Sequence, residues 1–132
     1  IRRITRDVRR AIAGTRVPLP HVRHAWGGGT SIGGCLREFL RTAGSPLLRR
    51  AVYAVIASDG LDVGNPEVLR EAMAEIHRRT AGVIWLNPLL ETAGYEPTAL
   101  GMSVARPYVT TLACANDAAG LRQLARMVRT RA

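Results

Sequence analysis

From residue 31 onward, stretches with helical spacing of apolar residues alternate with short stretches that are apolar throughout. The apolar positions of residues 31–42 fall on one face of a helix: Ile32, Cys35, Leu36, Phe39 and Leu40. The run AVYAVIA at residues 51–57 is continuously apolar, which is typical of a strand covered by helices on both faces. This alternation predicts strand, crossover helix and parallel strand, and therefore the α/β class.

The pattern continues along the chain. Asn65 and Pro66 predict a helix start, since Asn caps the first turn and Pro loses no hydrogen bond there, and the helix is expected to end near Thr80. Further strands are predicted at residues 82–86, with sequence GVIWL, and near 108–114, while residues 87–107 are expected to be irregular. A last helix is expected from Asp117. The sheet therefore has three predicted strands.

The opening segment predicts a basic amphipathic helix over residues 4–13, followed by a loop over 14–29. A length of 132 residues suits one domain, and no run of about 18 apolar residues predicts a membrane span. Cys35 and Cys114 lie far apart, without the Cys-x-x-Cys spacing of a zinc or dithiol site. We expect both to be small buried side chains in a cytoplasmic protein.

Charge is concentrated in the first part of the chain. Residues 1–50 hold 11 Arg against two acidic residues, whereas residues 51–132 hold 8 Arg against 8 acidic residues. All 19 basic residues are Arg, which supplies fixed charge and planar donors but can equally reflect a GC-rich coding sequence. The excess favours an anionic partner: nucleic acid, acidic lipid or an acidic protein surface.

Candidate chemistry lies just after each predicted strand, because open parallel sheets collect ligands beyond their carboxyl ends. These positions are Ser58-Asp59-Gly60, Asn87-Pro88 and Asn116-Asp117. The segment GGGTSIGG at residues 27–34 opens a helix, but its glycine spacing fails the dinucleotide-binding pattern, and a chain without Lys cannot form a P-loop. Nucleotide binding is therefore disfavoured.

A magnesium site suits these residues better. Mg²⁺ takes oxygen ligands and tolerates waters among them, so the hydroxyl of Thr30 and the carboxylate of Asp59 are suitable metal ligands. The alternative is structural: Thr30 as a helix N-cap and Asp59 as a turn former. Around the two candidate ligands, the rim of the site is expected to comprise Gly29, Ser31, Ser58, Gly60 and Asn87.

Several motifs occur in a fixed order: Gly28-Gly29-Thr30-x-Ile32-Gly33, Ser58-Asp59-Gly60, IWLNPLL, GYEP, GM and PYV. Together they resemble, over nearly the whole chain, the von Willebrand factor type A (VWA) domain of CoxE-like proteins. The resemblance implies a three-layer αβα, doubly wound, mainly parallel sheet. Such domains build a metal-ion-dependent adhesion site (MIDAS) from an Asp-x-Ser-x-Ser loop, a Thr and an Asp, and Thr30 and Asp59 match the last two.

One part of the family pattern is absent, since no Asp-x-Ser-x-Ser occurs in these 132 residues. We therefore expect residues 1–132 to be a partial VWA domain that lacks its first strands, the fold being incomplete at the N-terminus. Two side-chain ligands leave most of the magnesium shell to water. Binding of Mg²⁺ by this chain is accordingly expected to be weak or absent.

The resemblance also implies a function, which is binding rather than catalysis, so no catalytic residue is assigned. A CoxE-like protein is expected to act with a MoxR-type AAA+ ATPase in maturing a metalloenzyme such as molybdenum-containing carbon monoxide dehydrogenase. A carboxylate of the protein partner would complete the magnesium shell.

Two alternatives come from other classes. The first is a nucleic-acid-binding α/β protein that uses the arginines of residues 2–10, although nucleic acid is the less favoured partner. The second is an enzyme with a site around Asp59 and Asn87, for which no perturbed acid or base can be named. The pair His21-x-x-His24 has no third metal ligand nearby, so ordinary exposed histidines are expected.

Overall fold

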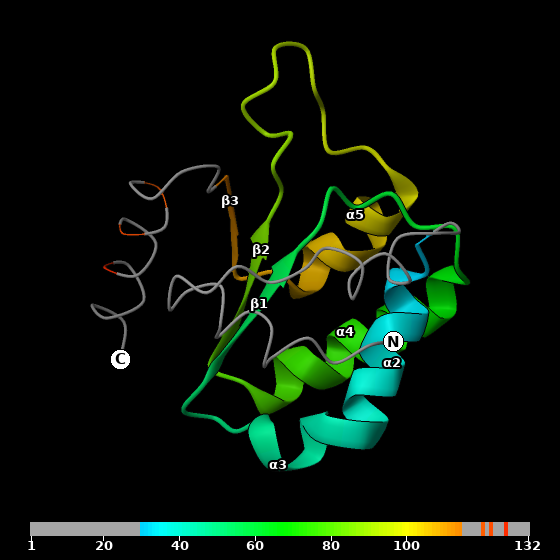
Figure 1. Cartoon of the computed structure of the whole chain (residues 1–132), viewed down its shortest axis with the longest axis vertical. Coiled ribbons are helices and arrows are strands. Elements are labelled where there is room, and N and C mark those ends of the chain that lie inside the picture. Colours follow the sequence, from blue (N-terminus) through cyan, green and yellow to red (C-terminus); the bar gives the residue numbers. More distant parts are fainter. Residues whose placement is uncertain (1–29, 115–119, 121, 123–125, 127–132) are drawn as a thin grey trace, which may run out of the picture.

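A three-stranded parallel sheet, in the order β1-β2-β3, forms the centre of the computed structural model (Figure 1). The structure describes residues 30–114, 120, 122 and 126. The strands are β1 (Tyr53–Ala57), β2 (Gly82–Leu86) and β3 (Thr111–Ala113). β2 pairs with both neighbours, with Tyr53 opposite Gly82 and Ile84 opposite Thr111. Parallel neighbours require crossover connections, and these supply the helices.

Helix α2 (Ile32–Phe39) precedes the sheet and continues through a π-helical segment (Leu40–Gly44) into the short α3 (Ser45–Leu47). Between β1 and β2 runs α4 (Pro66–Arg79). The Asn65 side chain accepts a hydrogen bond from the backbone N–H of Glu67 at 2.9 Å, which is the predicted cap. The predictions of α2, α4 and β2 are thus confirmed, with a π-helical extension of α2 added.

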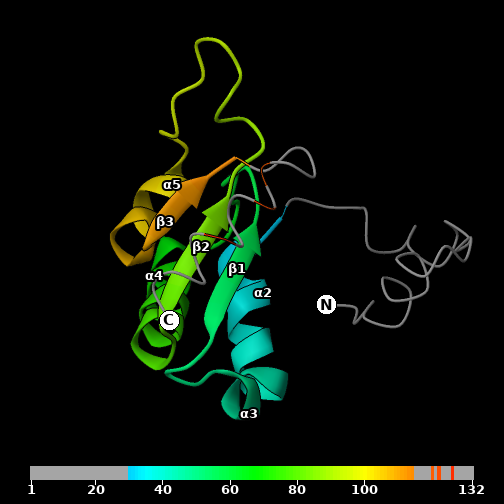
Figure 2. The ribbon, with the colours of Figure 1, turned by 90° about the vertical axis from the view of Figure 1, so that its left-hand side faces the viewer.

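The helices α2 and α4, together with α5 (Leu100–Ala105), lie on one side of the sheet (Figures 1 and 2). The largest fully buried apolar side chains lie on α4, β2 and α5: Leu69, Met73, Ile76, Val83, Trp85 and Met102. Burying each such side chain stabilises the fold by about 1.5–3 kcal/mol. Residues 30–114 therefore form two layers of the expected αβα arrangement, and the α/β class with a parallel sheet is confirmed.

Three expectations differ from the structure. Residues 87–107 contain α5, and a 3-10 helix (Arg106–Tyr108) follows it. Helix α5 was not predicted because it has only six residues and no side-chain cap. β1 is not covered on both faces, since Val55 is 56% exposed at the sheet edge. Neither cysteine is buried as expected, since Cys35 is exposed on α2 and Cys114 is half-exposed after β3.

The basic helix expected at residues 4–13, the loop at 14–29 and most of the helix expected from Asp117 lie outside the described residues. None of the helices in the described part of the chain is long and apolar enough to cross a membrane.

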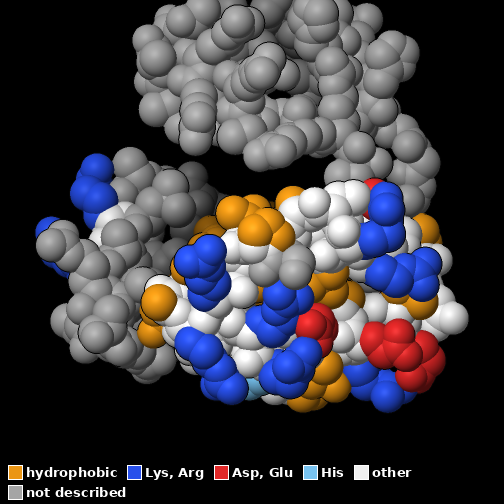
Figure 3. Space-filling view, turned by 90° about the horizontal axis from the view of Figure 1, so that it is seen from below, with side chains coloured by type: hydrophobic (Ala, Val, Ile, Leu, Met, Phe, Trp, Pro, Cys, Tyr) orange, Lys and Arg blue, Asp and Glu red, His pale blue; other side chains and the backbone are white. Residues whose placement is uncertain are grey.

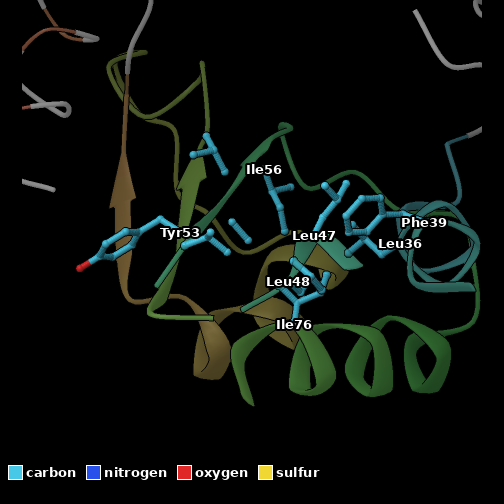
Figure 4. Close-up of a pocket in the computed structure, with 10 residues that line it drawn as sticks. Leu36, Phe39, Leu47, Leu48, Tyr53, Ile56 and Ile76 are labelled. Carbon is cyan, nitrogen blue, oxygen red and sulfur yellow. The ribbon is translucent and has the colours of Figure 1, made fainter. Parts of the chain in front are cut away.

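An apolar pocket of about 510 Å³ opens beside the edge of β1 (Figure 4). Side chains from α2, α3 and β1 converge on it, among them Leu36, Phe39, Leu47, Tyr53 and Ile56. Within residues 30–114, no strand pairs with the second edge of β1. An unpaired edge next to exposed apolar side chains is a template for association.

We therefore expect the 132-residue chain to self-associate. Replacing Val55, which is 56% exposed on β1, by Lys should lower the association, because a charge on an edge strand opposes pairing with another chain. Val63→Lys is the matched control, since Val63 is 73% exposed in a loop. Sedimentation velocity measures the effect. A wild-type chain that sediments only as a monomer and unfolds in one cooperative transition would contradict this expectation.

Candidate metal centre

Asp59 is the second residue after β1, at the carboxyl edge of the sheet. The ladder ends with the N–H of Ser58 donating to the carbonyl oxygen of Leu86 at 3.0 Å. One carboxylate oxygen of Asp59 then accepts from the N–H of Leu61 at 3.0 Å, and Ser58 Oγ accepts from the N–H of Gly60 at 3.1 Å. Asp59 is thus a turn former, as the structural alternative expected, while its second carboxylate oxygen has no such bond to any residue that the structure describes.

Two buried side chains, Trp85 and Asn87, and the half-buried Tyr95 hold this turn from beneath through its backbone carbonyls. The indole Nε1 of Trp85 donates to the carbonyl oxygen of Ser58 at 2.8 Å. The carbonyl oxygen of Asp59 accepts from the hydroxyl of Tyr95 at 3.2 Å and from Asn87 Nδ2 at 3.3 Å. Asn87 Nδ2 also donates to the Tyr95 hydroxyl at 2.8 Å. Moving the turn would break several of these bonds, so the position of Asp59 is fixed.

Close packing fixes the same turn from the side of α5. Gly60 has φ +82°, and a Cβ atom there would lie 2.5 Å from Met102 Cγ. A Cβ atom at Gly101 would lie 2.3 Å from the carbonyl oxygen of Gly60. Only glycine allows this backbone conformation and this approach of α5. The motifs Ser58-Asp59-Gly60 and Gly101-Met102 therefore pack directly against each other.

Thr30 lies on the other side of the loop, at the start of α2. Its carbonyl oxygen accepts from the N–H of Val63 at 3.1 Å, and its side chain is exposed. Ser31, not Thr30, is the N-cap of α2, with Oγ accepting from the N–H of Gly34 at 3.2 Å. The N-cap alternative for Thr30 is thus wrong, because the helix begins one residue later. Its hydroxyl does not cap α2.

Asp62 joins the two halves of the candidate site. Its Oδ1 accepts from the N–H groups of Ile32 and Gly64, both at 2.9 Å. A carboxylate at the first turn of a helix satisfies a free N–H and interacts favourably with the helix dipole. Asp62 therefore holds the loop that carries Asp59 against the helix that follows Thr30.

The expected rim is met in part. Ser31 and Ser58 are partly exposed beside the loop, but Gly60 is buried within it, and Gly29 lies outside the described residues. Asn87 differs from a rim position: it is fully buried, because its amide is needed beneath the turn, where Oδ1 also accepts from the N–H of Leu89 at 2.9 Å. Asn87 supports the site rather than facing a ligand.

The donor chemistry suits a hard divalent cation, because Thr30 supplies a hydroxyl and Asp59 a carboxylate. Within the described residues, no group of three or more His, Cys, Asp or Glu side chains is arranged to hold a metal ion. Mg²⁺ takes about six oxygen ligands, so these residues would form one side of a coordination shell and leave the rest open.

Sequence patterns did not reveal Asp62, Trp85 and Tyr95 as members of this site, although Trp85 and Tyr95 stand within IWLNPLL and GYEP. Their bonds to the loop span 27 residues for Trp85 and 36 for Tyr95. Helical and strand periodicity report only on near neighbours. The ordered motifs themselves were the signal, because nearly all of them meet at one turn.

These features define an α/β domain with a rigid, oxygen-bearing loop at the carboxyl edge of a parallel sheet. A family model described as "VWA domain containing CoxE-like protein" matches residues 1–121, and the chain belongs to this family. No curated protein matches the chain, and no solved structure does.

Removing the Tyr95 hydroxyl tests whether the buried bonds hold the loop. We expect Tyr95→Phe to lower the free energy of unfolding by about 1–2 kcal/mol, because the variant leaves Asn87 Nδ2 and the Asp59 carbonyl short of a partner. Tyr53→Phe is the control, because Tyr53 is also half-buried but no hydrogen bond of its hydroxyl occurs in the described structure. Urea denaturation measures both variants. Equal stability of Tyr95→Phe and Tyr53→Phe would show that these bonds do not hold the turn.

Proposed function

We propose that this chain is a Mg²⁺-dependent protein-binding module that binds its partner through the loop of residues 58–64, which we call the Asp59 loop. The observation that carries the proposal is that Asn87 and Tyr95 both donate hydrogen bonds to the backbone carbonyl of Asp59, which fixes the position of its half-buried carboxylate. A ligand whose position is set before binding loses little conformational entropy when it engages a cation or a partner.

Asp59 and Thr30 would hold the magnesium ion, with the Asp59 carboxylate as its charged ligand. The ion supplies an attraction for a carboxylate of the partner. Asp59 would bind and orient the ion, and Asp62 keeps the loop that carries Asp59 beside the helix that follows Thr30. Because the described residues enclose only one side of the ion, a carboxylate from the partner is a suitable further ligand.

The segment between β2 and α5 offers a second contact to the same partner. It rises from the sheet beside the loop (Figure 1), and residues 91–94 and 96–98 are exposed. Tyr95 ties this segment to the carbonyl oxygen of Asp59. The ion and the segment would then form one continuous binding surface for the partner.

Membership of the CoxE-like family supports a MoxR-type AAA+ ATPase as the partner. The client of the two proteins would be a metalloenzyme such as carbon monoxide dehydrogenase, and both would act in the cytoplasm. In this role the protein is a maturation factor and not an enzyme. The competing function is nucleic-acid binding, which the net charge of +9 favours. Its arginines at residues 2–10 lie outside the described residues.

The test is capture of the ATPase by the immobilised protein with Mg²⁺ and with EDTA. We expect capture to need Mg²⁺ and Asp59→Asn to lower it by about tenfold, since one charged ligand is lost, worth about 1.4 kcal/mol. Glu71→Gln, which removes an exposed carboxylate of α4, should leave capture unchanged.

Three outcomes would contradict the proposal. The first is capture that persists in EDTA, the second is a loss of capture in Glu71→Gln as large as in Asp59→Asn, and the third is capture that salt alone abolishes while nucleic acid is bound instead.

Binding of Mg²⁺ without the partner should be weak. A bound ligand stabilises the folded state by an amount that depends on the ratio of its concentration to Kd. A site with only two side-chain ligands has a high Kd, so millimolar Mg²⁺ should stabilise the folded chain little. Thermal unfolding with and without the ion measures this. A rise in Tm of several degrees would mean that the chain alone supplies a complete site.

A further inference from the structure

Five arginines gather at the amino edge of the sheet, opposite the Asp59 loop; we call them the arginine end. They are Arg49, Arg50, Arg78, Arg79 and Arg106. The first two lie in the turn before β1, the next two in the last turn of α4, and Arg106 begins the 3-10 helix after α5.

Backbone contacts bring these three segments to one end of the molecule. The N–H of Ala81 donates to the carbonyl oxygen of Val52 at 2.8 Å, which joins the end of α4 to the turn before β1. His77 Nδ1 lies 3.0 Å from the carbonyl oxygen of Tyr108, which joins α4 to the 3-10 helix. Figure 3 views this end and shows arginine side chains spread across it, with fewer acidic ones.

Little negative charge offsets the cluster. Glu75 pairs with Arg78 and, at 3.3 Å, with Arg79. The hydrogen bond from Arg78 lowers the pKa of Glu75, so this carboxylate stays ionised and offsets one positive charge. The ion pairs within the described part of the chain do not include Arg49, Arg50 or Arg106.

Helix dipoles account for only part of the cluster. The end of α4 carries about half a negative charge, which favours Arg78 and Arg79 in its last turn. Arg49 and Arg50 lie in a turn outside any helix. Arg49 donates to the carbonyl oxygen of Pro46 at 3.3 Å and Arg106 to that of Val109 at 3.5 Å, each through one guanidinium nitrogen. No hydrogen bond of their other guanidinium nitrogens occurs within the described part of the chain.

We propose that the arginine end is a second docking surface, which binds an acidic protein segment through Arg49, Arg50 and Arg106. Guanidinium groups bind carboxylates in a planar, two-point geometry. Nucleic acid is the less suitable polyanion, because single strands also need aromatic faces. Among the described residues, the tyrosines of β1 and of the 3-10 helix are both half-buried: Tyr53 packs against the Gly82 position, and the ring of Tyr108 contacts His77 edge-on.

The test compares two triple variants of the full chain that lose the same charge. Arg49→Gln/Arg50→Gln/Arg106→Gln removes the proposed contacts, whereas Arg37→Gln/Arg41→Gln/Arg70→Gln removes exposed arginines of α2, its π-helical extension and α4. The probes are a fluorescent oligoglutamate peptide and a single-stranded oligonucleotide of equal charge, measured by anisotropy at physiological salt. Thermal unfolding verifies that both variants fold.

We expect the first triple variant to weaken peptide binding by about tenfold and the second by less than about twofold. An equal loss in both would show that net charge alone binds the peptide and would overturn the proposal. Tighter binding of the oligonucleotide, lost in the first variant, would assign the surface to nucleic acid instead. Because Mg²⁺ is absent from this assay, its result does not depend on the Asp59 site.

Discussion

The hydrogen bonds that side chains of β2 and the segment after it donate to the carbonyl oxygens of Ser58 and Asp59 are the constraint on which the candidate site depends. Trp85 and Asn87 come from the end of β2 and Tyr95 from the segment after it, so the register of the sheet decides where these donors lie. A buried amide or indole left without a partner costs about 1–3 kcal/mol. The core therefore stabilises the turn and, with it, the position of the Asp59 carboxylate.

The amino and carboxyl ends of the parallel strands differ in charge because of the direction in which helix α4 runs between them. Helix α4 begins beside the Asp59 loop and ends at the arginine end, and its capping pattern puts Glu67 first and Arg78 and Arg79 last. The loop before β1 adds Arg49 and Arg50 to the basic edge, while Asp59 and Asp62 follow β1 at the other. One domain thus presents two chemically distinct surfaces on opposite edges.

Local patterns predicted what local forces decide. Helix α4 could be read from Asn65, Pro66 and the spacing of its buried face, and β2 from its apolar run. Asp59 could be placed because the carboxyl edge of a parallel sheet follows from strand order. By contrast, α5 exists because Gly101 lets it approach the carbonyl oxygen of Gly60. Tertiary contacts over such separations leave no periodic signal, which is also why Asp62 and the burial of Asn87 were missed.

We expect Asp59, in its fixed turn, and Thr30, at the start of α2, to bind a divalent cation together. The most direct measurement is a titration of the ¹⁵N-labelled protein with Mn²⁺, which shares the oxygen preference of Mg²⁺, followed by paramagnetic broadening of amide NMR signals. Broadening centred on Thr30, Asp59 and Leu61, and lost in Asp59→Asn, is the predicted result. Broadening centred on Glu91 and Glu96, or no selective broadening, would contradict the claim.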